Sequence, residues 1–483
     1  MRRELAILAI AFVISLPLVT PRIYASDEVQ YFAYLRSLWF DHDVSFENEY
    51  QHFYDAGVMR DPGFHETFLE RTTETGRRIS FATMGAAILW SPFYAAADGL
   101  VALGVAGDGV RDGYGPPYVR AVAYGSAVYG FLAVVIGWAL AHRLGLGRGA
   151  LPAALAVWFG TPLAFYIYVA PPMSHACSAF AVAAFVAVWL HVRARWTVGG
   201  GLALGALAAL MAMVREQDAL IAVGPAIDWA VTYGRAGADS TASGASGPSR
   251  PQLLGGAAAG LLALALCYLP QILAYEALNG QPRPSQLVAR KMNWLAPHAA
   301  GVVASPEHGL IFWTPLALLA IVGLVAGLAG RLGWTARPSV ARRDAASSPA
   351  LVAGVLLVMV ALQVYIAGSV ESWTVAGAFG QRRFLGLTAI FLIGLAALWP
   401  GEETSWRGGP SSRRGALALT LLVTLGTWWN LGLMAQFGSG LMDRQRLTLR
   451  ENAYHTFVTV PLRLPELVYR YVFARQSFFQ PKP

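Results

Sequence analysis

The chain has 483 residues, of which 56% are hydrophobic and only 13% carry a charge. This balance excludes an ordinary soluble globular protein and indicates one that crosses a membrane several times. The net charge of +8 comes from arginines spread over short connectors, so it bears on membrane topology and does not indicate nucleic-acid binding. Cys177 and Cys267 lie in apolar runs without metal-ligand spacing, and we expect buried thiols there.

Residues 1–20 combine a basic start with an apolar core, which predicts an uncleaved first span with its N-terminus in the cytoplasm. Pro21 is expected to stop this helix, and residues 21–78 then form a long polar loop on the far side. The later apolar runs each predict a helix: 79–105, 118–141, 151–169, 174–190, 198–213, 219–233, 253–275, 310–330, 350–367, 384–399 and 415–435.

Arginines gather in alternate connectors, which the positive-inside rule places in the cytoplasm: 143–148, 193–195, 235–250, 331–343 and 407–414. If 79–105 crossed the membrane fully, these connectors would face outward. We therefore expect 79–105 to form a re-entrant or interface-lying pair of helices, because Ser91-Pro92 breaks the helix and Asp98 would otherwise lie deep in lipid. The predicted fold is an all-α integral membrane bundle of about 11 spans with juxtamembrane helices in the first outer loop.

Two segments, 236–251 and 402–414, are small and polar and are expected to be flexible linkers. The tail, 436–483, then lies outside and is expected to form interfacial helices against lipid head groups. We accordingly divide the chain into a transmembrane domain, 1–435, whose first outer loop spans 21–117, and this tail.

The most informative stretch is Ser26 to Tyr50, which holds a large share of the acidic residues directly after the first apolar run. Asp27 and Glu28 lie nearest the membrane, where carboxylates usually face a water-filled cavity or the surface. The apolar residues that follow them recur at helical spacing and predict an amphipathic helix along the interface. A solvated loop that merely caps a helix is an equal alternative.

Other candidates lie in the remaining outer connectors. His175 follows Ser174 at the start of a helix and suits either a structural or a functional histidine. Arg215 is expected to form an intramembrane salt bridge with Glu216 or Asp218, and anion binding is the alternative. The glycine-rich segment 107–115 lacks a preceding strand, which favours a simple turn over a phosphate loop.

Basic residues in two outer loops are candidates for holding a phosphate. Arg290 and Lys291 precede Trp294, although a solvated basic turn is equally compatible with them. Arg382 and Arg383 stand where a helix begins, against the positive-inside trend, so either a phosphate site or a surface pair is expected. Two further candidates in these loops are Glu371 and His308.

Together these segments resemble the C-type (GT-C) membrane glycosyltransferases. The chain is most similar to bacterial family 39-like and lipid A aminoarabinose-transferase-like proteins, and more distantly to protein O-mannosyltransferases. The resemblance rests on the acidic first loop, region 79–105, PPMSHA, SPEHGLIFWTP and GAFGQRRF. Family 39 members often carry Asp where His175 stands here, so the resemblance assigns His175 no role.

The resemblance implies a sugar donor linked to polyprenyl phosphate, a lipid, glycan or protein acceptor, and a single displacement that inverts the anomeric centre. Asp27, with Glu28 beside it, would receive the proton of the acceptor hydroxyl. Arg382 and Arg383 are the first choice for the donor phosphate, followed by Lys291 and Arg290. The site would face the periplasm from a multi-pass protein of the cytoplasmic membrane, in contact with membrane lipids.

No cofactor and no metal are predicted, although a divalent ion could do the electrostatic work instead. The run Asp41-His42-Asp43 suits a hydrated surface better than a metal site. Two other functions remain open: a transporter or flippase of lipid-linked sugars, and a non-catalytic scaffold for envelope assembly. The absence of an internal sequence repeat and the long acidic first loop favour the enzyme over the transporter.

Overall fold

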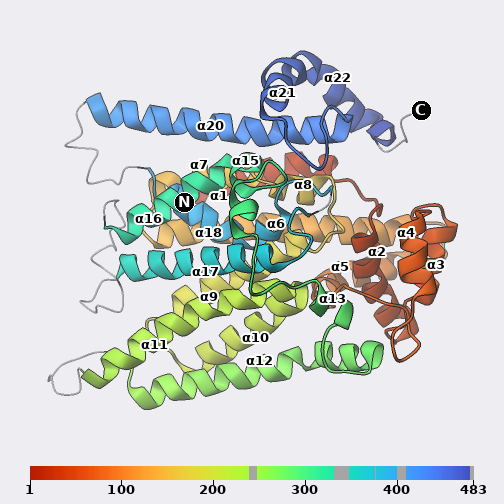
Figure 1. The fold of residues 1–483 in the computed structure, drawn as a ribbon, viewed down its shortest axis with the longest axis horizontal. Coiled ribbons are helices and arrows are strands. Elements are labelled where there is room, and N and C mark those ends of the chain that lie inside the picture. The colour runs from red at the N-terminus through yellow and green to blue at the C-terminus, as the bar shows by residue number, and fades with distance from the viewer. Residues whose placement is uncertain (239–246, 331–347, 376, 400–409, 479–483) are drawn as a thin grey trace.

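The computed structural model describes residues 1–238, 247–330, 348–375, 377–399 and 410–478. Within these ranges the regular structure is helical, apart from two isolated antiparallel bridges, Thr72 with Arg78 and Met292 with Val370. Long helices run side by side across Figure 1, and short helices gather at its right-hand end around α2 (Ser26–Arg36). We call this the α2 end of the bundle.

The bundle contains α1 (Arg2–Ser15), α5 (Gly85–Ala102), α6 (Pro116–Arg143), α7 (Gly147–Gly160), α8 (Leu163–Tyr168), α9 (His175–Val192), α10 (Val198–Val214), α11 (Val223–Ala238), α12 (Arg250–Asn279), α16 (Pro315–Leu328), α17 (Pro349–Ser369), α18 (Thr388–Ala396) and α20 (Pro410–Ser439). Shorter helices lie in the connectors: α3 (Glu47–Asp55), α4 (Pro62–Phe64), α13 (Gln286–Arg290), α14 (Ala299–Ala304) and α15 (Leu310–Trp313). The chain ends in α21 (Leu449–Tyr454) and α22 (Val460–Phe473).

The predicted apolar runs coincide with helices or with consecutive helical segments. Run 151–169 is divided into α7 and α8 because Thr161 takes an extended conformation directly before Pro162. The two predicted linkers fall partly, and the arginine-rich connector 331–343 wholly, outside the described residues.

In the part of the chain that the structure describes, 5 helices are long and apolar enough to cross a membrane: α6, α9, α12, α17 and α20. Helices α10 and α16 are apolar but shorter. An all-helical protein embedded in a membrane follows from these helices, whereas the count of about 11 spans stays a prediction.

Two predictions about helix ends and breaks are wrong. Helix α1 ends at Ser15, and a short 3₁₀ turn containing Pro17 follows it, so Pro21 does not end the helix. Helix α5 continues through Pro92 as one helix, not as a broken pair. The carbonyl that Pro92 leaves without its helical donor is that of Ile88, and the Ser91 hydroxyl donates to it at 2.8 Å.

The segment after α5 folds back as turns and neutralises the acid inside that helix. Arg111 donates to both carboxylate oxygens of Asp98, at 2.7 and 2.6 Å, and Tyr118 donates at 2.9 Å. The Arg111 hydrogen bond, opposed by partial burial, lowers the pKa of Asp98 to about 2. The 107–115 segment thus contributes a partner for a buried carboxylate.

Helix α12 lies at the edge of the bundle in Figure 1 and exposes a row of leucines, among them Leu261, Leu262 and Leu266. Cys177 is buried as expected, but Cys267 is exposed on this same helix, so the prediction of two buried thiols is wrong. An apolar exposed face on a helix of this length is what a lipid-facing span presents.

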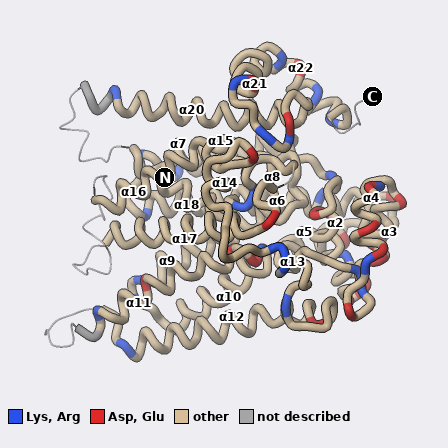
Figure 2. The backbone as a smooth tube through the Cα atoms, viewed as in Figure 1, with Lys and Arg blue, Asp and Glu red and all other residues tan. Residues whose placement is uncertain are grey.

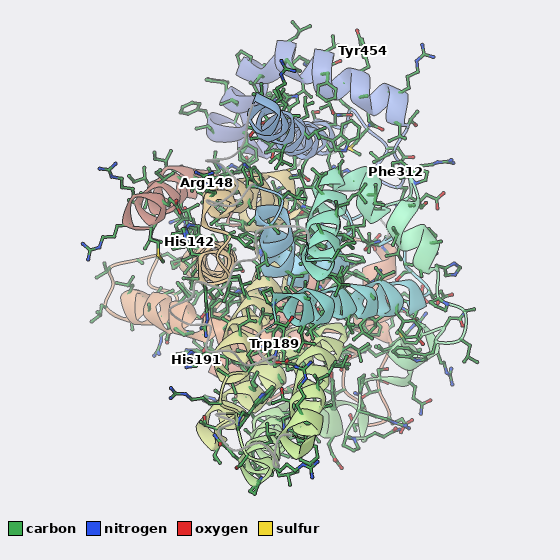
Figure 3. The ribbon with its side chains drawn as sticks, turned by 90° about the vertical axis from the view of Figure 1, so that its left-hand side faces the viewer. His142, Arg148, Trp189, His191, Phe312 and Tyr454 are labelled. Atoms are coloured by element: carbon green, nitrogen blue, oxygen red, sulfur yellow. The ribbon has the colours of Figure 1, made fainter. Side chains whose placement is uncertain are left out.

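The end of the bundle opposite α2 contains two networks of hydrogen-bonded polar side chains. Glu4 accepts hydrogen bonds from Trp138 at 2.8 Å and lies 2.6 Å from His142. Asp228 accepts from Trp189 at 2.9 Å and pairs with Arg193. Figure 3 looks at the bundle from this end, with His142 and Trp189 labelled. Acidic residues instead gather around α3 and α4 at the α2 end, as Figure 2 shows.

The C-terminal helices fold back against the start of the chain. The Tyr471 hydroxyl donates to the carbonyl of Leu18 at 2.9 Å, and Arg475 donates to the carbonyls of Val19 and Pro17 at 2.6 and 2.7 Å. Helix α22 also exposes large apolar residues, including Leu462 and Phe473. The tail therefore fastens the segment that leads from α1 into α2.

Candidate functional site

Two adjacent acids at the start of α2, Asp27 and Glu28, differ in their exposure and in their partners. The Glu28 carboxyl is fully buried and turns back to accept from the backbone N–H groups of Tyr24 at 2.7 Å and Ala25 at 3.2 Å. Burial raises its pKa to about 8, against the opposing effect of these hydrogen bonds. Glu28 is thus a mostly neutral helix cap at neutral pH. Asp27 precedes it with a side chain that is 40% exposed.

Asp27 meets an arginine that lies 355 positions further along the chain. The Arg382 guanidinium donates from Nη1 to Oδ2 of Asp27 at 2.7 Å. Burial alone would lower the pKa of Arg382, but the Asp27 carboxylate raises it above its ordinary value. Arg382 opens the 3₁₀ segment η7 (Arg382–Leu387), which leads into α18. The structure therefore brings together the two residues that the sequence placed at opposite ends of the chain.

Arg383 is fixed at both its backbone and its side chain. Its guanidinium donates to the Ser372 carbonyl at 2.9 Å and to the Ser372 hydroxyl at 3.3 Å. Its own carbonyl accepts from Gln217 at 2.9 Å and from Gln363 at 2.6 Å. Burial, and then repulsion from nearby guanidiniums, lowers its pKa, yet an arginine stays charged at neutral pH.

Arg215 does not form the expected ion pair with Glu216 or Asp218. It donates instead to Nδ1 of His175 at 2.7 Å and to Gln217 at 3.3 Å. Tyr275 donates its hydroxyl to Glu216, and Ser178 donates to Asp218 at 2.6 Å. The prediction fails because the chain leaves α10 in the 3₁₀ segment η4 (Glu216–Ala222), which turns both acids towards other helices.

The His175–Arg215 hydrogen bond fixes the state of the imidazole. A guanidinium can only donate, so Nδ1 of His175 must be the acceptor and a neutral ring carries its proton on Nε2. His175 is buried at the first position of α9, with the Tyr166 ring edge-on at 4.4 Å. In this arrangement His175 orients Arg215.

These contacts define an arginine cluster, Arg215, Arg382 and Arg383, with Asp27 as its carboxylate. Electrostatic interactions connect Arg383 with Arg382, Arg215 and Asp27. They also connect the buried Tyr166 with Arg382, Arg215 and Asp27. Asp218 also interacts electrostatically with Arg215. Three guanidiniums against these two carboxylates still leave an excess of positive charge, which suits an anion such as a phosphate.

The other basic candidates lie outside this cluster. Lys291 is exposed and stands over the Phe81 ring at 5.1 Å, and Arg290 is exposed beside Arg283. The exposed Glu371 donates its backbone N–H to the Lys291 carbonyl at 2.7 Å. This pairing of loops directly precedes Ser372, so Lys291 and Glu371 contribute backbone support to the residue that holds Arg383.

His308 supports the loop that leads directly to Arg382. Its Nε2 donates to the carbonyl of Ala378 at 2.7 Å, and its ring stacks on Trp313 at 4.4 Å. Burial lowers its pKa to about 4, so it is neutral at neutral pH. Gln381 donates to the His308 carbonyl at 3.2 Å, which ties the residue before Arg382 to this support.

Sequence reasoning missed the uncharged residues that position the arginines. Gln217, Gln363 and Ser372 bind the backbone or the side chain of Arg383. Their only sequence signal is a polar side chain within or between apolar runs, which many unrelated residues share.

No metal site accompanies the cluster in the described ranges, where no group of three or more His, Cys, Asp and Glu residues is placed to hold an ion. In the run 41–43, Asp41 pairs with Arg36, and Asp43 accepts from Ser37 at 2.8 Å. No family model, no curated protein and no solved structure matches the chain. The functional argument therefore rests on the cluster itself.

Proposed function

We propose that this protein is a membrane glycosyltransferase of the GT-C type, which transfers a sugar from a polyprenyl-phosphate donor to an envelope acceptor. The observation that carries the proposal is the 2.7 Å contact between Asp27 and Arg382, inside a cluster with a positive excess. A carboxylate that can take a proton and guanidiniums that can hold a phosphate are the two groups that such a transfer needs.

In the proposed reaction the acceptor hydroxyl oxygen attacks the anomeric carbon of the donor sugar. The bond between that carbon and the phosphate oxygen breaks, and its electron pair leaves with the polyprenyl phosphate. Arg382 and Arg383 stabilise the charge that develops on this leaving group. Asp27 takes the proton of the acceptor hydroxyl, and the single displacement inverts the anomeric centre.

The surroundings of the cluster suit a lipid-linked donor. Long apolar helices provide surface for a polyprenyl chain, while the cluster lies where α2, η7 and the start of α9 meet. The opposite end of the bundle carries Arg143, Arg193 and Arg195 at or just beyond helix ends. The positive-inside rule then supports a cytoplasmic position for that end and an outward-facing site in the cytoplasmic membrane.

The direct test offers purified protein a panel of labelled polyprenyl-phosphate sugars with extracted envelope acceptors and measures transferred label. Asp27→Asn is expected to reduce transfer by roughly 100- to 10,000-fold, because it removes the base while the donor still binds. The control is Asp55→Asn, which removes one charge from an exposed residue of the same loop. Near-normal turnover in Asp27→Asn would show that Asp27 is not the base.

The phosphate role is tested by donor binding. Arg382→Ala and Arg383→Ala are each expected to weaken donor affinity by about 10- to 100-fold, the usual worth of a hydrogen bond to a charged group. Arg290→Ala, on the exposed α13, is the matched control. Movement of donor across vesicle membranes without transfer of label would favour a flippase, and full function without Asp27 and both arginines would favour a scaffold.

A further inference from the structure

Arg382 has two competing partners in the proposed reaction. Its guanidinium already holds the Asp27 carboxylate at 2.7 Å, with side-chain exposures of 21% for Arg382 and 40% for Asp27. The donor phosphate needs the same guanidinium, and the acceptor hydroxyl needs the same carboxylate. While Oδ2 of Asp27 accepts from Arg382, this oxygen is not free to accept from an acceptor hydroxyl. The pair seen here is therefore a resting arrangement in which neither residue is ready for its role.

The neighbouring arginines make a phosphate the stronger partner. Arg383 is repelled by Arg382 and Arg215, and at Arg383 the Asp27 carboxylate offsets only part of this repulsion. A phosphate presents several oxygens and can bind two guanidiniums at once, whereas the Asp27 contact with Arg382 runs through one pair of atoms. If a phosphate replaces Asp27 beside Arg382, it therefore reduces the repulsion among the three arginines, which the Asp27–Arg382 pair leaves in place.

We propose that the Asp27–Arg382 pair is a latch that the donor phosphate opens. The phosphate takes Arg382 from Asp27, and the released carboxylate turns to the acceptor hydroxyl. No covalent bond changes in this exchange. The inference rests on the proposed function and adds an order of events, in which the base becomes available only after the donor has bound.

The latch has a consequence for phosphate binding that can be measured. Asp27 and the phosphate compete for Arg382, so each weakens the binding of the other by the same factor. Removing the Asp27 charge must therefore strengthen phosphate binding, even though it removes the base. An uncharged residue that lines the site would give unchanged binding instead, and a residue that helps to bind the donor would give weaker binding.

The experiment measures the affinity of the purified full-length protein for a polyprenyl monophosphate. Asp27→Asn is expected to bind it about 5- to 20-fold more tightly than wild type, within the usual range of coupling between two ligands of one site. Asp55→Asn, which removes the same charge from an exposed position, is expected to match wild type. Asp27→Glu keeps the charge and is also expected to stay close to wild type.

Each outcome decides the matter. Unchanged or weaker binding by Asp27→Asn, compared with wild type, overturns the latch while leaving the proposed transferase intact. If Asp55→Asn or Asp27→Glu binds the polyprenyl monophosphate as tightly as Asp27→Asn does, the latch is overturned as well. Failure of the wild type to bind the polyprenyl monophosphate overturns the proposed function. Inorganic phosphate is the second probe. If the affinity of Asp27→Asn exceeds that of wild type by the same factor for inorganic phosphate as for polyprenyl monophosphate, Asp27 competes with the phosphate and not with the lipid tail.

Discussion

Glu28 and Asp27 are adjacent acids with different surroundings. The N–H groups of Tyr24 and Ala25 hold Glu28 inside the protein, and its pKa rises to about 8 because burial outweighs these bonds. Asp27 is half exposed and faces a guanidinium. Of the two acids, only Asp27 therefore presents its carboxylate to the arginine cluster, and Glu28 places it by fixing the first turn of α2.

Glu28 makes the stability of the protein depend on pH. Its pKa is about 8 in the folded chain, against an ordinary value of 4.5, so the folded chain keeps a proton that the unfolded chain loses between these values. Stability therefore falls as pH rises through this window, by up to ~1.4 kcal/mol per pH unit.

Glu28→Gln keeps an oxygen that can accept from the same amides but cannot titrate. We expect the melting temperature of wild type to fall relative to that of Glu28→Gln between about pH 5 and about pH 8. Asp55→Asn, at an exposed carboxylate, should not change the slope. Parallel curves for wild type and Glu28→Gln would contradict the assignment of Glu28 as a buried acid that is protonated when folded.

At the scale of elements, α10 and α12 approach each other through paired glycines. A Cβ atom added to Gly205 would fall 1.9 Å from the carbonyl oxygen of Gly260, and one added to Gly201 would fall 2.0 Å from that of Gly256. Two backbones can come this close only without side chains between them. This contact holds α12, with its exposed leucines, against the rest of the bundle.

Gly205→Ala is expected to push α12 away from α10 and to destabilise the protein by at least about 1–3 kcal/mol, the usual cost of overpacking. The matched control is Gly199→Ala in the same helix, where an added Cβ meets no atom within 4 Å. Thermal unfolding in detergent compares the two variants. Equal melting temperatures for both would show that the α10–α12 contact is looser than the glycine pairs imply.

At the scale of the whole molecule, sequence reasoning located the helices but not all of their contacts. Asp27 could be identified because a carboxylate beside the bilayer is costly, and Arg382 because two arginines at an outer helix start run against the positive-inside trend. Their meeting, and the roles of Gln217 and Gln363, depend on helix packing between distant segments, which periodicity does not encode. Arg215 was mispaired because its sequence neighbours are acidic, while the fold turns them away.

The tail completes the arrangement at the α2 end. Arg475 and Tyr471 bind the carbonyls of residues 17–19, and Thr20 donates its N–H to the Tyr168 carbonyl at 2.8 Å. These bonds fix the chain that runs from α1 to Asp27, and they join it to α8, which precedes His175. The tail thus fixes the segment that leads to Asp27, the proposed base, and none of these bonds involves Arg382 or Arg383, so its loss should affect turnover more than binding.

Arg475→Ala is expected to lower kcat for sugar transfer severalfold while leaving donor affinity unchanged. The segment that leads from α1 to α2 loses its hydrogen bonds to the tail, so Asp27 at the start of α2 is held less firmly in position. Loss of the hydrogen bonds to the carbonyls of Pro17 and Val19 should also cost about 1–3 kcal/mol of stability. Arg463→Ala is the control, since Arg463 pairs with Glu466 at the surface of α22 and such pairs contribute little. A wild-type kcat in Arg475→Ala would mean that α2 holds Asp27 in place without the tail.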